Sequence, residues 1–335
     1  MLTAVVGINW GDEGKGRMVD LFSAEHEIVV RYQGGNNAGH TVVNERGKFI
    51  LNLLPSGILR PGTVNVLGPG MVLDLEHLTN EVAHIREQGV AITPEHLKIS
   101  DRATICMPYH KMMDILEEDR LADKKFGSTR RGIGPVYADK YMKKTLRTGD
   151  LLFPDKLREK LADLVEWKNI TVQGYGHEPV SVDEMYAWLE KYAFPWREYL
   201  CNTTEYLSAQ ADAGKSILFE AQLGALRDID FGIYPYTSSS STIAAYAPIG
   251  AGIPAKRLDS VVGIMKAYSS CVGEGPLVCE LFGEEGDRLR EDGAEYGAAT
   301  GRPRRVGGGE GVAARDGVQM QGANELALRT IDVHA

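Results

Sequence analysis

The sequence predicts an α/β fold in which helices flank a mostly parallel central sheet. The β-branched run at 3–8 is followed by a glycine-rich loop and then by a helical pattern, which is the opening unit of a parallel sheet. The order of strand and glycine-rich loop recurs at 27–41, and further apolar runs alternate with helical patterns. No repeat, low-complexity segment or linker interrupts this series, so residues 1–335 are expected to form a single domain.

The remaining elements follow in chain order. Four further runs have the length and apolar character of buried strands: 63–67, 216–220, 260–265 and 326–333. Residues 73–87 and 154–168 each place apolar side chains on one helical face, and Ser181 to Glu184 has the pattern of a capping box that opens another helix. A helical excursion from the sheet is therefore expected near 150–210.

Composition limits the partners. The net charge of −9 argues against a nucleic-acid duplex or an anionic membrane. The four cysteines form no CxxC pair and are interpreted as core thiols of a reducing compartment. The sequence contains no signal-peptide pattern and no apolar run of membrane-spanning length, so a cytoplasmic protein is expected.

The first glycine loop, GDEGKG at 11–16, lies between a predicted strand and a predicted helix. Such a loop presents backbone N–H groups to an anion, and Lys15 adds a positive charge. It is not a Walker A motif, because Gly16 stands where that motif has a Ser or Thr that binds Mg²⁺. The fold is thus expected to be similar to P-loop NTPases without a Walker A motif, with Asp12 as the nearest metal ligand. Taken alone, the loop is equally consistent with a tight, solvated turn.

The second glycine loop, GGNNAGHT at 34–41, also follows a predicted strand. Loops at the carboxyl ends of parallel strands meet at the ligand crevice of an open α/β sheet. Within this loop His40 could act as a general acid near a transferring phosphoryl group. The alternative is a structural histidine in a turn, but two converging loops would bring an acidic residue and His40 into one site.

Together, WGDEGKGR at 10–17 and GGNNAGHT at 34–41 resemble the two signature loops of the bacterial-type adenylosuccinate synthetase family. Further matches follow in the family's order, between Val5 and Val333: RGIGP at 131–135, DID at 228–230, YPY at 234–236, KAY at 266–268, VGEGP at 272–276 and TGR at 300–302. Any one of these motifs could be coincidence, whereas the ordered set is specific.

The resemblance implies a ligase that joins L-aspartate to IMP in the first committed step of AMP synthesis from IMP. The γ-phosphoryl group of GTP would pass to the 6-oxygen of IMP. The amine of aspartate would then displace phosphate from this 6-phosphoryl-IMP intermediate, giving adenylosuccinate, GDP and phosphate. The resemblance also implies one Mg²⁺ per subunit and a homodimer that shares its IMP sites across the interface.

The resemblance assigns residues by position. Asp12 would be the base, His40 the acid and Gln222 a further catalytic residue, while Mg²⁺ would contact Asp12 and the carbonyl of Gly39. The residues expected to bind GTP are Gly11, Asp12, Glu13, Gly14, Lys15, Gly16, Arg17, Gly39, His40, Thr41, Arg304, Thr330, Ile331 and Asp332. Those expected to bind IMP are Asp12, Glu13, Gly14, Lys15, Asn37, Ala38, Gly39, His40, Thr129, Lys143, Gln222, Ser238 and Arg302. Those expected to bind aspartate are Ala298, Ala299, Thr300, Gly301, Arg302, Pro303 and Arg304.

Several positions depart from the family pattern. Gln222 stands one place earlier than the family's glutamine, and Lys143 stands where members usually have an arginine that reaches the neighbouring subunit's IMP. The guanine-reading TKLD segment of the family reads RTID at 329–332, with Thr330 in place of the lysine. Family members usually continue well beyond this point, so the C-terminal portion of the family fold is expected to be missing.

Three other functions are compatible with parts of this pattern. One is a truncated nucleotide-binding homologue without ligase activity. The second is a phage-like 2-aminoadenylosuccinate synthetase, against which the retained Asp12 argues, since that group has a smaller residue there. The third is a GTPase switch, for which an aspartate-binding arginine loop would have no purpose.

Overall fold

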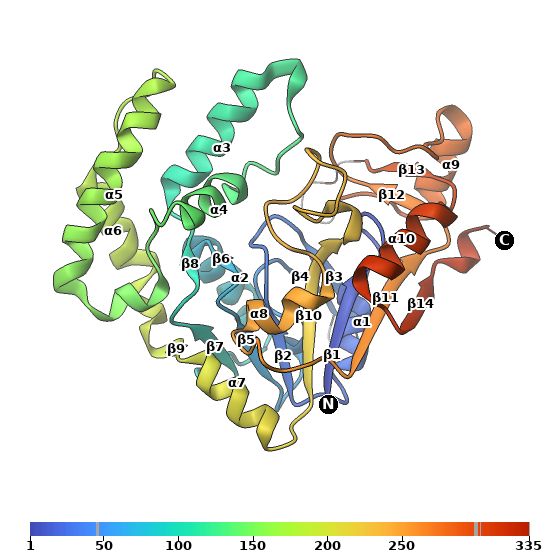
Figure 1. The fold of residues 1–335 in the computed structure, drawn as a ribbon, viewed down its shortest axis with the longest axis horizontal. Coiled ribbons are helices and arrows are strands. Elements are labelled where there is room, and N and C mark those ends of the chain that lie inside the picture. Colours follow the sequence, from blue (N-terminus) through green and yellow to red (C-terminus); the bar gives the residue numbers. More distant parts are fainter. Residues whose placement is uncertain (45–46, 298–300, 302, 335) are drawn as a thin grey trace.

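The computed structural model, which describes residues 1–44, 47–297, 301 and 303–334, is built on an eight-stranded parallel sheet (Figure 1). Its strand order is β14-β11-β1-β10-β2-β5-β7-β9, and every neighbouring pair is parallel. The strands are β1 (Leu2–Gly7), β2 (Ile28–Arg31), β5 (Val64–Leu67), β7 (Leu97–Ser100), β9 (Leu200–Cys201), β10 (Ile217–Gly224), β11 (Ser260–Lys266) and β14 (Glu325–Arg329). The predicted fold class is confirmed.

Helices and short two-stranded sheets surround this core. The helices are α1 (Lys15–Phe22), α2 (Leu75–Glu87), α3 (Pro108–Leu121), α4 (Ile133–Tyr141), α5 (Pro154–Gly174), α6 (Val182–Tyr192), α7 (Thr203–Asp212), α8 (Ala247–Ala251), α9 (Gly283–Asp292) and α10 (Gly311–Gln321). The small sheets pair β3 (His40–Asn44) with β4 (Gly47–Leu51), β6 (Val72–Leu73) with β8 (Thr104–Ile105), and β12 (Ser269–Cys271) with β13 (Arg305–Gly307). None of the described helices is long and apolar enough to cross a membrane.

The central strands are apolar on both faces because helices cover both. Ala4 and Val6 of β1 face a cluster that includes residues of α7 and α8, whereas Val5 faces the opposite cluster with Val19 of α1. This alternation follows from the two-residue period of a strand. A doubly covered strand therefore has no polar face, which explains the continuous apolar runs in the sequence.

The predicted helical excursion is confirmed, with two corrections. Helix α5 runs to Gly174, beyond the predicted end at 168, because Val172 continues its buried face. The two-residue strand β9 interrupts the excursion and joins the central sheet beside β7. Ser181 caps α6 as predicted, since its hydroxyl accepts hydrogen bonds from the backbone N–H groups of Asp183 and Glu184.

The predicted strand at 326–333 is wrong in its second half. Strand β14 ends at Arg329, and residues Ile331–His334 form a 3₁₀ turn. Thr330 has a φ of 56°, in the left-handed region that no strand can continue through. This break places Arg329 and the segment after it at the edge of the sheet where the glycine loops lie.

Candidate active site

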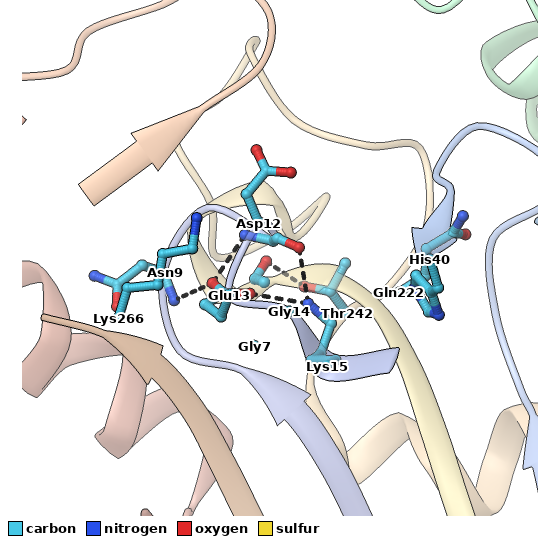
Figure 2. Close-up of polar contacts among 12 residues, drawn as sticks. Gly7, Asn9, Asp12, Glu13, Gly14, Lys15, His40, Gln222, Thr242 and Lys266 are labelled. Carbon is cyan, nitrogen blue, oxygen red and sulfur yellow. Dashed lines mark hydrogen bonds and ion pairs between the residues drawn. The ribbon is translucent and has the colours of Figure 1, made fainter. Parts of the chain in front are cut away.

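The first glycine loop connects β1 to α1 at the carboxyl edge of the sheet. Gly11 and Gly14 both have positive φ, at 106° and 78°, a conformation that glycine adopts without steric cost. The loop also lies directly on β10: a Cβ at Gly11 would come within 2.6 Å of the Cα of Leu223. Both glycines are therefore required by the backbone path, and the loop delivers Asp12 to its tip (Figure 2).

Glu13 and Lys15 face the inside of this loop. The carboxylate of Glu13 accepts hydrogen bonds from the backbone N–H groups of Asn9 and Gly11, at 3.0 and 2.8 Å. Its other oxygen lies 2.9 Å from Nζ of Lys15, which also donates to the carbonyl of Gly11. Both side chains are almost fully buried, so in this conformation the Lys15 ammonium is ion-paired with the Glu13 carboxylate.

Asp12 belongs to a network of opposite charges. Its carboxylate lies 3.4 Å from Nη2 of Arg304, and Nη1 of Arg304 donates to Glu295 at 2.7 Å. The carboxylate of Glu295 also pairs with Lys266, at the end of β11, and accepts from the hydroxyl of Tyr268. Burial raises the pKa of Asp12, and the positive charges of Arg304 and Lys266 only partly oppose this.

The Glu295 carboxylate and the Lys266 ammonium stabilise each other's charged forms. Burial alone would raise the pKa of Glu295, but Lys266, Tyr268 and Arg304 together hold it below its usual range. Burial lowers the pKa of Lys266 despite the attraction of Glu295. Arg304 is thus held between two carboxylates at the place where the sequence predicts a site for the carboxylates of aspartate.

His40, at the start of β3, is buried against α1 and paired with Glu220 of β10. Its Nδ1 lies 2.7 Å from Oε1 of Glu220, a fully buried carboxylate that also accepts from the backbone N–H and the hydroxyl of Ser56. Burial lowers the pKa of His40, and Glu220 opposes this. Since a carboxylate accepts, Nδ1 is the protonated nitrogen, and Nε2 is left for a ligand.

Close approach of α1 to His40 depends on Gly16. A Cβ at this position would lie 2.8 Å from Cβ of His40, so the first turn of the helix and the second loop touch here. The structure thereby brings the two predicted loops together, as the strand-and-loop order predicts.

The rest of the second loop lies over Gln222, which is fully buried. Its Nε2 donates to the carbonyl of Gly35 at 3.0 Å, while its Oε1 has no partner among the described residues. A Cβ at Gly34 would be 1.7 Å from that oxygen, so Gly34 makes room for the amide. The side chain of Asn37 accepts from the backbone N–H of Gly35, and the carbonyl of Ala38 accepts from Asn52.

The remaining predicted residues are exposed or partly buried, or they lie outside the described residues. Thr129, Lys143, Gly301, Pro303, Ile331 and Asp332 are exposed, as is Arg17, whereas Gly39, Thr41, Ser238 and Thr330 are partly buried. Ala298, Ala299, Thr300 and Arg302 are predicted aspartate or IMP contacts that lie outside the described residues. Of the residues predicted to bind aspartate, Gly301, Pro303 and Arg304 are among the described residues.

Sequence reasoning assigned no part to four charged residues that contact this site: Glu220, Lys266, Glu295 and Arg329. Glu220 carries a detectable signal, because a carboxylate inside the apolar run SILFE must be paired when buried. Lys266 and Arg329 sit at the carboxyl ends of strands, which is the ligand edge of a parallel sheet. Glu295 lies in a loop between α9 and β13 and gives no such signal.

Comparison with known proteins agrees with this geometry. The sequence profile of the adenylosuccinate synthetase family matches residues 4–335. Adenylosuccinate synthetase 2 of Pseudoalteromonas translucida is 49% identical over 331 residues, covering 98% of this chain and 78% of that protein. The adenylosuccinate synthetase of Lactococcus lactis subsp. lactis is 44% identical over 330 residues, covering 98% of this chain and 76% of that protein.

Two solved structures have a similar fold. The fully ligated adenylosuccinate synthetase of Plasmodium falciparum superposes with a TM-score of 0.92 at 32% identity, covering 99% of this chain and 77% of that one. The succinoaminodeoxyadenylate synthetase PurZ of cyanophage S-2L, bound to dGMP and dATP, has a TM-score of 0.67 at 22% identity, over 97% of this chain and 83% of that one. The second likeness extends to the fold alone. The profile match over residues 4–335 and the identity of the curated relatives place this chain in the adenylosuccinate synthetase family of ligases.

Proposed function

We propose that this protein joins L-aspartate to IMP at the expense of GTP, through a 6-phosphoryl-IMP intermediate. The observation that carries the proposal is the close contact between the two glycine loops at one sheet edge. Gly16, at the end of the loop that carries Asp12, lies against His40 of the second loop, and His40 is paired with Glu220. The chemistry needs a base for the purine, a hydrogen-bond donor for the phosphoryl group, and backbone N–H groups and cations for the phosphates. Asp12, His40, and the backbone N–H groups and cations of the two loops are the candidates for these roles.

In the first step Asp12 would take the ring proton of IMP, which makes the 6-oxygen nucleophilic. A carboxylate with a raised pKa is a stronger base than an ordinary one. Arg304 and Lys266 keep a positive field around the carboxylate, which opposes protonation before the substrate arrives.

His40 would support the transferring phosphoryl group. The carboxylate of Glu220 fixes the imidazole through Nδ1, so that Nε2 is the atom presented to the substrate. The negative charge of bound phosphates favours the imidazolium, which would turn Nε2 into a donor to the γ-phosphoryl oxygens. Glu220 then stabilises the charged ring from the other side, as in other acid–histidine pairs.

Mg²⁺ fits this site as a partner of the nucleotide and not as a resident of a protein cage. Among the described residues no group of three or more His, Cys, Asp or Glu side chains could hold a metal. Mg²⁺ at nucleotide sites commonly uses one or two carboxylates together with phosphate oxygens and waters. Asp12, partly exposed at the loop tip, and the carbonyl of Gly39 would supply the protein ligands. When bound, the ion would neutralise charge on the phosphates.

Arg304 would hold aspartate in the second step. A guanidinium binds carboxylates through two parallel hydrogen bonds, and Arg304 already binds the carboxylate of Glu295. The substrate would compete with Asp12 for the other face of this side chain. Arg302 and residues 298–300, which the resemblance also assigns to aspartate, stay predictions.

The test is adenylosuccinate formation by the purified chain with IMP, aspartate, GTP and Mg²⁺, beside Asp12→Ala. We expect product only when all four components are present, and no detectable product from the variant. A folded protein that binds IMP but forms no product would instead support the truncated nucleotide-binding homologue. Product formed from a guanine nucleotide in place of IMP would support the phage-like activity.

A further inference from the structure

Arg329 links the last strand of the central sheet to the first glycine loop. Strand β14 pairs with β11 so that Arg329 lies opposite Lys266, at the carboxyl edge of the sheet. Its Nη1 donates to the carbonyl of Gly14 at 2.7 Å and to the carbonyl of Glu13 at 3.2 Å. No substrate contact is predicted for Arg329 from the sequence, since the family's TKLD segment has a threonine at this place.

These two contacts fix the direction of two amide N–H groups. The carbonyls of Glu13 and Gly14 belong to the peptide units that carry the N–H groups of Gly14 and Lys15. In a planar trans peptide the N–H points opposite to the C=O. With both carbonyls turned toward Arg329, the two N–H groups point away from it.

Those N–H groups are at the start of α1, where a helix has no internal partners for its first donors. Gly14 is the N-cap residue and is left-handed, with φ 78° and ψ 38°. Successive N–H groups around a left-handed residue at a helix N-terminus form a concave anion site. By binding the two carbonyls on the opposite side, Arg329 keeps these N–H groups directed into the concavity.

The position of Gly14 is matched to this arginine. A Cβ at Gly14 would lie 1.5 Å from Nη1 of Arg329, so the guanidinium fills the space that a side chain would take. Glycine at 14 consequently serves both the backbone conformation and the seat of Arg329.

The electrostatic surroundings point to an anionic ligand. Among the described residues no carboxylate forms an ion pair with Arg329; its neighbour in charge is Arg17, on the first turn of α1. Burial and the like charge of Arg17 both lower the pKa of Arg329. The negative charge of Glu295 also acts on Arg329, but Glu295 is paired with Lys266 and Arg304. An anion bound near Arg329 and Arg17 would offset the repulsion between their charges.

We infer that Arg329 is a positioning residue for the phosphate chain of the bound nucleoside triphosphate: it orients the Gly14 and Lys15 N–H groups and, with Arg17, supplies positive charge. The inference rests on the proposed function for the identity of the nucleotide, but its geometry requires only a polyphosphate. The carboxyl end of β14 would then belong to the triphosphate site, next to residues 330–332, which the sequence already assigns to GTP.

The test measures binding of inorganic tripolyphosphate, GTP, GMP and IMP by calorimetry to the wild type, Arg329→Met and Arg329→Gln. Loss of a charged hydrogen bond predicts roughly 10–100-fold weaker binding of tripolyphosphate and GTP by Arg329→Met. GMP should weaken far less, because it lacks the phosphates that reach the loop. Arg329→Gln, which can still donate to a carbonyl, should recover part of the loss. Arg315→Met, an exposed position on α10, is the matched control and should bind like the wild type.

Unchanged tripolyphosphate binding by Arg329→Met, or no binding by the wild type, would overturn the inference. So would an equal loss for tripolyphosphate, GMP and IMP, which marks a merely structural side chain. A selective loss in the variant, together with a wild type that forms no adenylosuccinate, would sustain this inference while the proposed function failed.

Discussion

At the scale of single residues, the buried carboxylate of Glu220 decides which nitrogen of His40 can meet a substrate. Glu220→Gln keeps the size of the side chain and removes its charge. The imidazolium would lose its stabilising partner, and the amide could also bind the wrong tautomer of the ring. We expect kcat to fall by about 10²-fold or more, the range found for general acid–base groups, with KM for IMP changed far less.

Steady-state kinetics with IMP as the varied substrate would check this, with thermal unfolding as the control for folding. Loss of Glu220 also has a stability signature. Although burial raises the pKa of Glu220, His40, Arg31 and Ser56 together hold it below its unfolded value. Its stabilising contribution is therefore present above the unfolded pKa and is lost as pH falls through the folded pKa. A kcat within threefold of the wild type would remove Glu220 from the mechanism.

Asp12 gives a second residue-scale prediction, on pH dependence. A base must be ionised, so activity appears as pH rises through its pKa. Because burial raises the pKa of Asp12, the acid limb of the kcat/KM profile for IMP should lie above the ordinary aspartate value. The profile of the wild type is measured with GTP and Mg²⁺ well below saturation, so that the ion does not lower the pKa of Asp12. An acid limb at the ordinary value would contradict the assignment of Asp12 as the base.

At the scale of elements, the contact between α1 and the second loop depends on one missing methyl group. In Gly16→Ala the new Cβ would meet Cβ of His40 at 2.8 Å, and one of the two elements must move. We expect the turnover number to fall by about tenfold or more, since displacement of a catalytic group by about 1 Å can cost 10²-fold.

The matched control is Gly174→Ala, at the last residue of α5, where a Cβ meets nothing within 4 Å. Alanine there should stabilise the protein by about 0.4–1 kcal/mol, because it lowers the conformational entropy of the unfolded chain, and activity should be unchanged. Urea unfolding and initial rates on both variants separate the two effects. Equal activity of Gly16→Ala and the wild type would show that the elements yield without harm to the site.

The elements that could be predicted are those whose local pattern and tertiary setting agree. β1, α1 and the loop between them follow from a β-branched run, two conformationally required glycines and an amphipathic helix. β9 could not be foreseen, because two residues carry no period and are strand only through pairing with β7. The His40–Glu220 pair joins residues 180 positions apart, and only the sheet order brings them together.

At the scale of the whole molecule, the parallel sheet gathers the site from distant parts of the chain. β1, β2, β10, β11 and β14 are consecutive in parallel pairing, so their carboxyl ends share one edge. Asp12, the second loop, Glu220, Lys266 and Arg329 come from these five strands or the loops that follow them. Lys143 is different: it is exposed just beyond α4, with a φ of 63°.

An exposed cation outside this edge is consistent with a contact to the IMP of a second subunit, as the resemblance implies for a homodimer. The prediction is complementation between two impaired variants. Lys143→Met should raise KM for IMP, and Asp12→Ala should abolish turnover. In a mixed dimer with an isologous interface, one of the two sites receives a native Asp12 from one subunit and a native Lys143 from the other. Mixing the variants should therefore restore part of the activity that neither has at limiting IMP, whereas mixing Asp12→Ala with Arg315→Met should only dilute the active subunits.

Sedimentation at the assay concentration must find dimers for this to hold. A monomer that keeps full activity on dilution, or a mixture no more active than its components, would mean that each subunit completes its own site and that Lys143 has no part in it.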